Sequence, residues 1–222
     1  GIMNGTTNYI VDAMRRQGAD FAEVLAEAQR LGYAERDPSA DIDGIDVLNK
    51  TIISASVAFD VACEKSLPAS GIRNLTKADL ELFAAHGRTL KLLGHGVASD
   101  GRYAAAVEPV AVPADSLEAS VPGNFNLLTL EGATVGELKF YGQGAGSLPT
   151  GNAMVQDVLD AAAGRVPCYD FTRGLAYDPS LLTSNYVFRT TVGAPRDAEW
   201  YASGAWMLKH LTAVEARETF SK

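Results

Sequence analysis

The stretch LGYAERDPSADIDGIDVLNK, residues 31–50, decides how the first part of the chain is organised. Its Leu31-Gly32 pair predicts a helix end, because glycine readily adopts the left-handed conformation that closes a helix. Tyr33 to Ala40 follows as a loop containing Pro38. A further helix is predicted from about residue 41 to Phe59, with apolar residues at helical spacing. The window thus predicts two helices joined by a loop, with several carboxylates where the second helix begins.

Capping residues place two more helices around this window and mark the start of the helix that ends at Leu31. Thr6 or Thr7 is predicted to cap a helix that runs to Gln17 and ends at Gly18. Asp20 with Glu23 forms a capping pair before the apolar run that ends at Leu31. Thr76 with Asp79 predicts a helix over 77–86, closed by Gly87.

Beyond residue 88 the apolar pattern changes to the alternation typical of strands. Two hairpins are predicted, one from 89–97 and 103–112 around Asp100-Gly101, the other from 125–130 and 135–141. A helix from about 149–163 follows, then a strand at 186–192 and a helix at 199–220. Helices first and antiparallel strands afterwards predict an α+β fold, with helices packed on a mostly antiparallel or mixed sheet.

Composition excludes several functional classes. The 222 residues carry a net charge of -8, which argues against nucleic acid as a partner because phosphate binding needs clustered Lys and Arg. No apolar run approaches the roughly 20 residues that a membrane span needs. Cys63 and Cys168 are far apart, which favours free thiols in a reducing cytoplasm. The three histidines are scattered, so no metal site is predicted.

Asp46 and Lys50 are the residues in the window with the clearest chemical potential. Four residues apart on a helix, they share one face about 6 Å apart along the axis. Such a pair is commonly an ordinary surface feature, and acidic residues favour helix starts. Alternatively, two carboxylates beside a lysine can hold a substrate ammonium group while the lysine transfers a proton. From residue types and spacing alone, both interpretations stay open.

The whole window resembles the signature of the homoserine dehydrogenase family, L-G-Y-A-E-x-D-P-x-x-D-x-x-G-x-D-x-x-x-K, without a gap. The opening GIMNGTTNYI, residues 1–10, is similar to a second family segment. So is VGELKFYG, residues 135–142, together with Gly144-Ala145-Gly146 and Pro149-Thr150. The similarity runs in order from residue 1 to about residue 164, so it rests on several independent segments.

The resemblance implies the interconversion of L-homoserine and L-aspartate 4-semialdehyde with NADP or NAD, in threonine and methionine biosynthesis. By similarity, Lys50 is the catalytic proton donor and acceptor. Glu35 and Asp46 would bind the amino-acid end of the substrate, and Asp41 would support the same pocket. Gly32 and Gly146 match positions where the family's backbone approaches the nicotinamide cofactor, and the absence of a Cβ suits such contact.

The resemblance also implies a longer, dimeric protein. The family's nucleotide-binding domain would precede Gly1 and hold most of the cofactor, so the chain alone is expected to be inactive. Family members pair through sheet edges, so a homodimer is expected. We expect residues 1–164 to form the catalytic and dimerisation domain. Residues 165–222 would be a C-terminal extension, in which Tyr186-Val187-Phe188-Arg189 is similar to the first strand of an ACT regulatory domain.

Two other classes of function compete with this interpretation. One is a non-catalytic module that binds or senses an amino acid. The other is a dimerisation module in which Asp46 and Lys50 are surface charges. Lys50 distinguishes an enzyme from the first module, because a lysine beside a site that only binds ammonium would repel the ligand. The dimerisation module predicts instead that Lys50→Ala is harmless.

Overall fold

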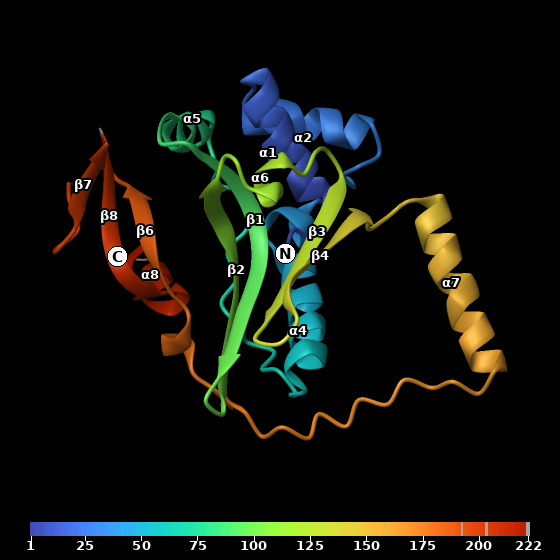
Figure 1. Ribbon diagram of the computed structural model, residues 1–222. Coiled ribbons are helices and arrows are strands. Elements are labelled where there is room, and N and C mark those ends of the chain that lie inside the picture. Colours follow the sequence, from blue (N-terminus) through green and yellow to red (C-terminus); the bar gives the residue numbers. More distant parts are fainter. Residues whose placement is uncertain (192, 203, 221–222) are drawn as a thin grey trace. The chain divides into compact units, whose positions relative to one another are not determined.

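The computed structural model describes residues 1–191, 193–202 and 204–220, in a mixed arrangement of helices and small sheets (Figure 1). In chain order the elements up to residue 113 are α1 (Gly5–Gln17), α2 (Phe21–Arg30), α3 (Ser39–Ile42), α4 (Ile45–Phe59), α5 (Lys77–Ala85), β1 (Arg88–Ser99) and β2 (Arg102–Pro113). They are followed by α6 (Leu117–Ser120), β3 (Phe125–Gly132), β4 (Gly136–Gln143), α7 (Ser147–Ala162), β5 (Ala176–Tyr177), η1 (Pro179–Leu181), β6 (Thr183–Arg189), β7 (Glu199–Ala202), β8 (Ala205–Thr212) and α8 (Ala213–Phe220). The α+β class is therefore confirmed. None of the helices in the described ranges is long and apolar enough to cross a lipid bilayer.

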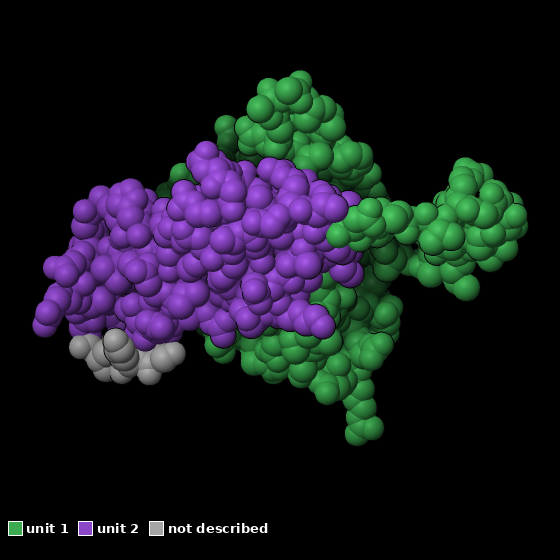
Figure 2. All heavy atoms as spheres, turned by 90° about the horizontal axis from the view of Figure 1, so that it is seen from below, with its two compact units in different colours: residues 1–51, 69–94, 107–170 green, residues 52–68, 95–106, 171–222 purple. Residues whose placement is uncertain are grey.

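The described residues form two compact units, coloured separately in Figure 2. The first collects residues 1–51, 69–94 and 107–170. The second collects residues 52–68, 95–106 and 171–222. The second unit therefore draws on three separate stretches of the chain and not on its C-terminal part alone.

The core of the first unit lies where α1, α2 and α5 meet the first halves of α4 and β1. Its fully buried side chains include Ile10, Val24, Ile42, Val47 and Leu92. They recur on α1, α2 and α4 at the helical spacing seen in the sequence, so each helix turns one apolar face inward. Burial of such aliphatic side chains contributes roughly 1.5–3 kcal/mol each.

The predicted hairpins are both present. β1 neighbours β2 across a turn in which Asp100 and Gly101 have φ of 50° and 74°. Positive φ at both central residues is what a tight hairpin turn demands. β3 pairs with β4 in antiparallel register from Phe125 opposite Gln143 to Gly132 opposite Gly136. The short strand β5 adds to β2 in parallel, so that sheet is mixed.

Three local predictions need correction. The cap of α1 is Asn4, whose side chain accepts the Thr7 N–H, and not Thr6 or Thr7. The helix expected from residue 41 to Phe59 is broken at Asp43-Gly44, where Gly44 has a φ of 82° that no α-helix contains. Asp41 on α3 therefore lies on a different helix from Asp46 and Lys50 on α4.

The third correction concerns the region from residue 199 to 212, which is not helical. β7 and β8 form an antiparallel pair, and β8 also pairs with β6. Aromatic residues such as Trp200 and Trp206 favour strands, and pairing with β6 overrides the helical pattern. Only α8 keeps the predicted helix. The strand predicted at 186–192 lies at Thr183–Arg189, and its expected last residue, Val192, is outside the described residues.

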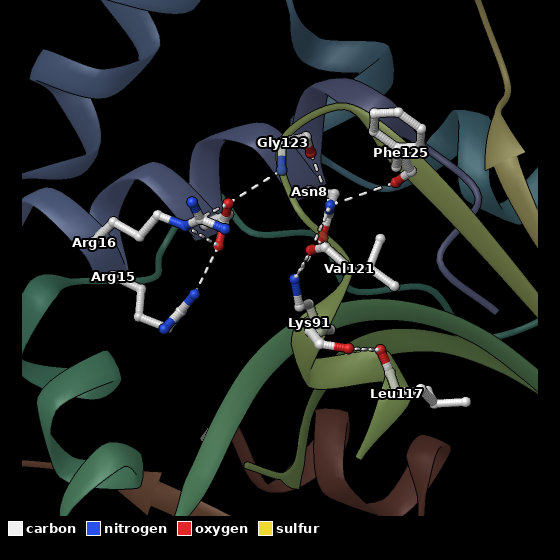
Figure 3. Close-up of polar contacts among 10 residues, drawn as sticks. Asn8, Arg15, Arg16, Lys91, Leu117, Val121, Gly123 and Phe125 are labelled. Atoms are coloured by element: carbon white, nitrogen blue, oxygen red, sulfur yellow. Dashed lines mark hydrogen bonds and ion pairs between the residues drawn. The ribbon is translucent and has the colours of Figure 1, made fainter. Parts of the chain in front are cut away.

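A buried lysine joins α1, β1 and the segment before β3 (Figure 3). Lys91 is 1% exposed, and its Nζ donates to Asn8 Oδ1 and to the Val121 carbonyl, each at 2.8 Å. Asn8 Nδ2 donates onward to Gly123 O at 2.7 Å. Burial lowers the pKa of Lys91 to about 8, although the Asp12 carboxylate opposes that change.

This burial predicts a pH dependence of stability. Between pH 8 and 10.5 the unfolded chain keeps the Lys91 proton that the folded chain has released, so the free energy of unfolding rises with pH. The gain reaches about 3 kcal/mol by pH 10.5 and is lost as the pH falls toward 8. Urea unfolding of the wild type and of Lys91→Met across this range measures it. An identical pH slope in the two proteins would contradict the assignment.

Candidate active site

Three segments of the first unit bring Asp41, Asp46 and Lys50 together around the start of α1. Asn4 Nδ2 donates to Asp41 Oδ1 at 2.6 Å and to Asp46 Oδ2 at 2.9 Å. Lys50 Nζ lies 2.7 Å from Asp46 Oδ2 and donates to the Met3 carbonyl at 3.0 Å. The helical pair predicted from spacing is therefore real, and it is joined to a second carboxylate through Asn4.

Asn4 occupies the centre of this cluster because its side chain serves α1 at the same time. Its Oδ1 accepts the Thr7 N–H at 2.8 Å, which satisfies one of the unpaired amides of the first helical turn. Only 5% of Asn4 is exposed. The Asp46 and Lys50 side chains are 32% and 46% exposed, so the cluster has a buried base and an open side.

The backbone of Gly71 packs directly against the bend between α3 and α4, at Ile42 and Asp43. The Ile72 N–H donates to the Ile42 carbonyl at 2.7 Å. A Cβ at Gly71 would lie only 2.0 Å from that carbonyl oxygen and 2.5 Å from two backbone atoms of Asp43. Close backbone packing therefore requires glycine here, and it fixes the separation of the two helices that carry Asp41 and Asp46.

Arg73 holds the same bend from the outside. Its guanidinium donates to both carboxylate oxygens of Asp43 at 2.6 and 2.7 Å, and to Ser39 Oγ at 3.2 Å. The hydrogen bonds from Arg73 keep the pKa of Asp43 below its ordinary value. Asp43 is thus engaged in a structural ion pair and is distinct from the cluster around Asn4.

Glu35 is the one predicted substrate residue that the structure leaves apart. Its carboxylate is exposed and forms no hydrogen bond or ion pair with the described residues, while its carbonyl accepts from Gln29 Nε2 at 2.9 Å. The loop that carries it is tied to α1 through Thr6 Oγ1, which donates to Tyr33 O at 2.6 Å. The rings of Tyr9 and Tyr33 also pack, with centroids 4.8 Å apart.

The two predicted cofactor glycines lie on separate turns. Gly32 follows α2 with a φ of 78°, and no atom lies within 4 Å of a Cβ built there. Gly146 precedes α7 with a φ of 124°. Both backbones are exposed, and neither is hydrogen-bonded to Asp41, Asp46 or Lys50 within the described ranges.

Beside the second turn lies an unsatisfied polar atom. Asn126 Oδ1 is buried and accepts no hydrogen bond from the residues that the structure describes, and a Cβ at Gly144 would come within 2.0 Å of Asn126 Nδ2. An acceptor next to a turn that excludes side chains suits a ligand that brings an amide or hydroxyl donor. This arrangement is compatible with a carboxamide-bearing cofactor near Gly146.

Sequence reasoning missed Asn4, the Met3 carbonyl, Gly71 and Arg73. Asparagine is among the preferred helix caps, so the sequence did contain a signal for Asn4. No local pattern indicates that its amide also reaches residues 37 and 42 positions away. An open cavity of about 540 Å³ lies in the second unit, lined by residues that include Leu67, Tyr177 and Arg217, and it contains none of the cluster.

Comparisons with known proteins identify a family for the first 159 residues. The family model for homoserine dehydrogenase matches residues 1–159. A homoserine dehydrogenase of Corynebacterium glutamicum is 45% identical over 178 residues, which cover 75% of this chain and 39% of that protein. The chain therefore spans well under half the length of such relatives.

Solved structures give the same result. Homoserine dehydrogenase of Staphylococcus aureus at pH 7.0 superposes with a TM-score of 0.77 at 29% identity, covering 99% of this chain and 61% of that one. A hyperthermophilic archaeal homoserine dehydrogenase mutant, solved in complex with NADPH, has a TM-score of 0.60 at 27% identity, with coverage of 75% and 47%.

The packing of Gly71 against residues 42 and 43 leads to a stability prediction. Gly71→Ala should destabilise the chain by roughly 1–3 kcal/mol, because the added methyl group displaces backbone that cannot move freely. Gly142→Ala is the matched control, since no atom lies within 4 Å of its Cβ, and it should change stability by less than about 0.5 kcal/mol. Urea unfolding measures both; equal stabilities would contradict the packing argument.

Proposed function

Because the chain belongs to the homoserine dehydrogenase family, we propose that it supplies the substrate-binding and proton-transfer part of an enzyme that interconverts L-homoserine and L-aspartate 4-semialdehyde. The observation that carries the proposal is the grouping of Asp41, Asp46 and Lys50 around Asn4. A surface ion pair does not need a buried amide beneath it. A buried amide that joins the pair to a second carboxylate supports a site for a cationic substrate group instead.

Each charged residue then has a role, which for Asp41, Asp46 and Lys50 is supported by their contacts and for Glu35 by the family resemblance alone. Asp46 and Asp41 bind the substrate ammonium group, and Glu35 joins them from its exposed loop when substrate is present. Lys50 has three ammonium hydrogens, of which Asp46 and the Met3 carbonyl occupy two. The third is directed to the substrate oxygen, so Lys50 as an ammonium group donates a proton to the aldehyde oxygen, and as a neutral amine it receives one from the hydroxyl group in the reverse direction.

We further propose that NAD or NADP is the cofactor, in line with the family and with the NADPH complex of the archaeal relative. When bound, a nicotinamide supplies the hydride chemistry. The exposed backbones of Gly32 and Gly146, together with Asn126 Oδ1, are the groups of this chain that suit contact with it. Most of the cofactor would be held by the portion of the relatives that this chain does not match, so we propose that the chain alone does not oxidise homoserine.

The role of Lys50 can be tested in a chimaera in which residues 1–159 replace the matching segment of the C. glutamicum enzyme. Lys50→Ala should lower kcat by about 10²–10⁴-fold, since it removes the acid/base group, while KM for homoserine changes far less. The isolated 222-residue chain should show no turnover.

Lys77→Ala is the matched control for this experiment. Lys77 also forms an ion pair four residues along a helix, with Glu81 at 3.8 Å, but outside the cluster. Its loss should leave both kinetic constants unchanged. Wild-type turnover in the Lys50→Ala chimaera would end the catalytic assignment.

We also propose that two copies of the chain pair through the β3–β4 ribbon. Leu128 lies opposite Phe140, and Leu130 opposite Leu138, so the four side chains share one face. Leu130, Leu138 and Phe140 are 39%, 39% and 59% exposed. A contiguous exposed apolar face of this kind is typical of a protein interface.

Phe140→Asp should therefore convert a dimer to a monomer without unfolding the chain, because the side chain is already exposed. Light scattering coupled to size-exclusion chromatography measures the mass. Glu131→Gln, on the opposite face of the ribbon, should stay dimeric. A wild-type chain that is monomeric at high concentration would contradict the proposal.

A further inference from the structure

Asn4 differs from the other members of the cluster because it carries no charge. One amide nitrogen donates to two carboxylates that come from different helices, Asp41 on α3 and Asp46 on α4. Two such groups repel each other, and the break at Asp43-Gly44 leaves their helices joined only by a short bend. Backbone packing at Gly71 sets the separation of the helices, and the donor hydrogens of Asn4 link the two carboxylate side chains directly.

The orientation of this amide is set by α1 and not by the carboxylates. Oδ1 of Asn4 accepts the Thr7 N–H at 2.8 Å, and Thr7 is itself buried. The planar amide must then direct its nitrogen away from the helix, toward Asp41 and Asp46. Both ends of the side chain are satisfied, so the amide has a single favourable orientation.

An uncharged clamp preserves the charge of the site. An arginine or lysine in this place would also bind the two carboxylates, but it would cancel their charge. With the neutral Asn4, the cluster contains two carboxylates and the single ammonium group of Lys50, so its net charge is negative. Oδ2 of Asp41 and Oδ1 of Asp46 accept no hydrogen bond from the described residues and remain available to a ligand.

We propose that Asn4 is a specificity-determining residue, whose neutral amide holds Asp41 and Asp46 together so that their excess negative charge selects a substrate with an ammonium group. The inference rests on the proposed function, in which an amino acid is the substrate. Asn4 touches neither the reacting oxygen nor the cofactor in this account. It acts through the two carboxylates, and it therefore affects which ligand binds more than how fast the bound ligand reacts.

The test compares two ligands on the 222-residue chain by NMR titration. L-homoserine carries the ammonium group, and 4-hydroxybutyrate lacks it but keeps the hydroxyl and carboxylate groups. Asn4→Ser removes the clamp while keeping a good helix cap, because serine caps as well as asparagine. Asn4→Thr is the second variant, should the first not fold.

The wild-type chain should prefer homoserine, and Asn4→Ser should weaken homoserine binding about tenfold, which is the loss expected for about 1.4 kcal/mol. Binding of 4-hydroxybutyrate should stay within about twofold. Thr76→Ala is the control for general destabilisation, because it removes the cap of α5 and should leave the preference intact.

Three results would overturn the inference: no preference in the wild type, an unchanged preference in both Asn4 variants, or equal loss of both ligands. Failure of the proposed function is seen separately, as a chimaera without turnover. A preference for the amine in such a case would leave the role of Asn4 standing while ending the enzymatic assignment.

Discussion

The side chain of Asn4 is the constraint on which the candidate site depends. Its oxygen accepts an N–H at the start of α1, and its nitrogen joins two carboxylates from α3 and α4. One planar group thus links the geometry of a helix terminus to the geometry of an acidic pair. Lys50 is placed by the same region of the chain, because the carbonyl that it binds belongs to Met3, the residue before Asn4. A shift of the start of α1 would therefore alter a contact of each of the three charged residues.

Packing elsewhere in the first unit keeps that helix and that bend in place. Lys91 and Asn8 connect the first turn of α1 to the segment before β3 through buried hydrogen bonds. Gly71 lets a neighbouring backbone approach the α3–α4 bend, and Arg73 closes the bend from the solvent side through Asp43. Unpaired buried polar groups are costly, so these contacts favour one arrangement of α1 over others. The cluster therefore has a buried side, formed by Asn4, and an exposed side, formed by Asp46 and Lys50.

Local signals in the sequence predicted the elements well where local chemistry decides them. The capping box at Thr76 and Asp79 and the Asp100-Gly101 turn both appear where their residue types require them. Three features were beyond such reasoning. The break at Gly44 depends on contact with Gly71, the strands β7 and β8 depend on pairing with β6, and the contacts of Asn4 span about 40 residues. Spacing predicted the Asp46–Lys50 pair but could not distinguish a surface ion pair from a site, because the buried amide beneath it comes from a distant segment.

The cluster around Asn4 is proposed to receive an amino-acid substrate with its reacting oxygen at Lys50. A crystal structure of the chain soaked with L-homoserine tests this proposal most directly. We expect the substrate nitrogen within hydrogen-bond distance of Asp41 and Asp46, and the hydroxyl oxygen within that distance of Lys50 Nζ. Homoserine bound elsewhere on the chain, or bound with its hydroxyl group turned away from Lys50, would contradict it.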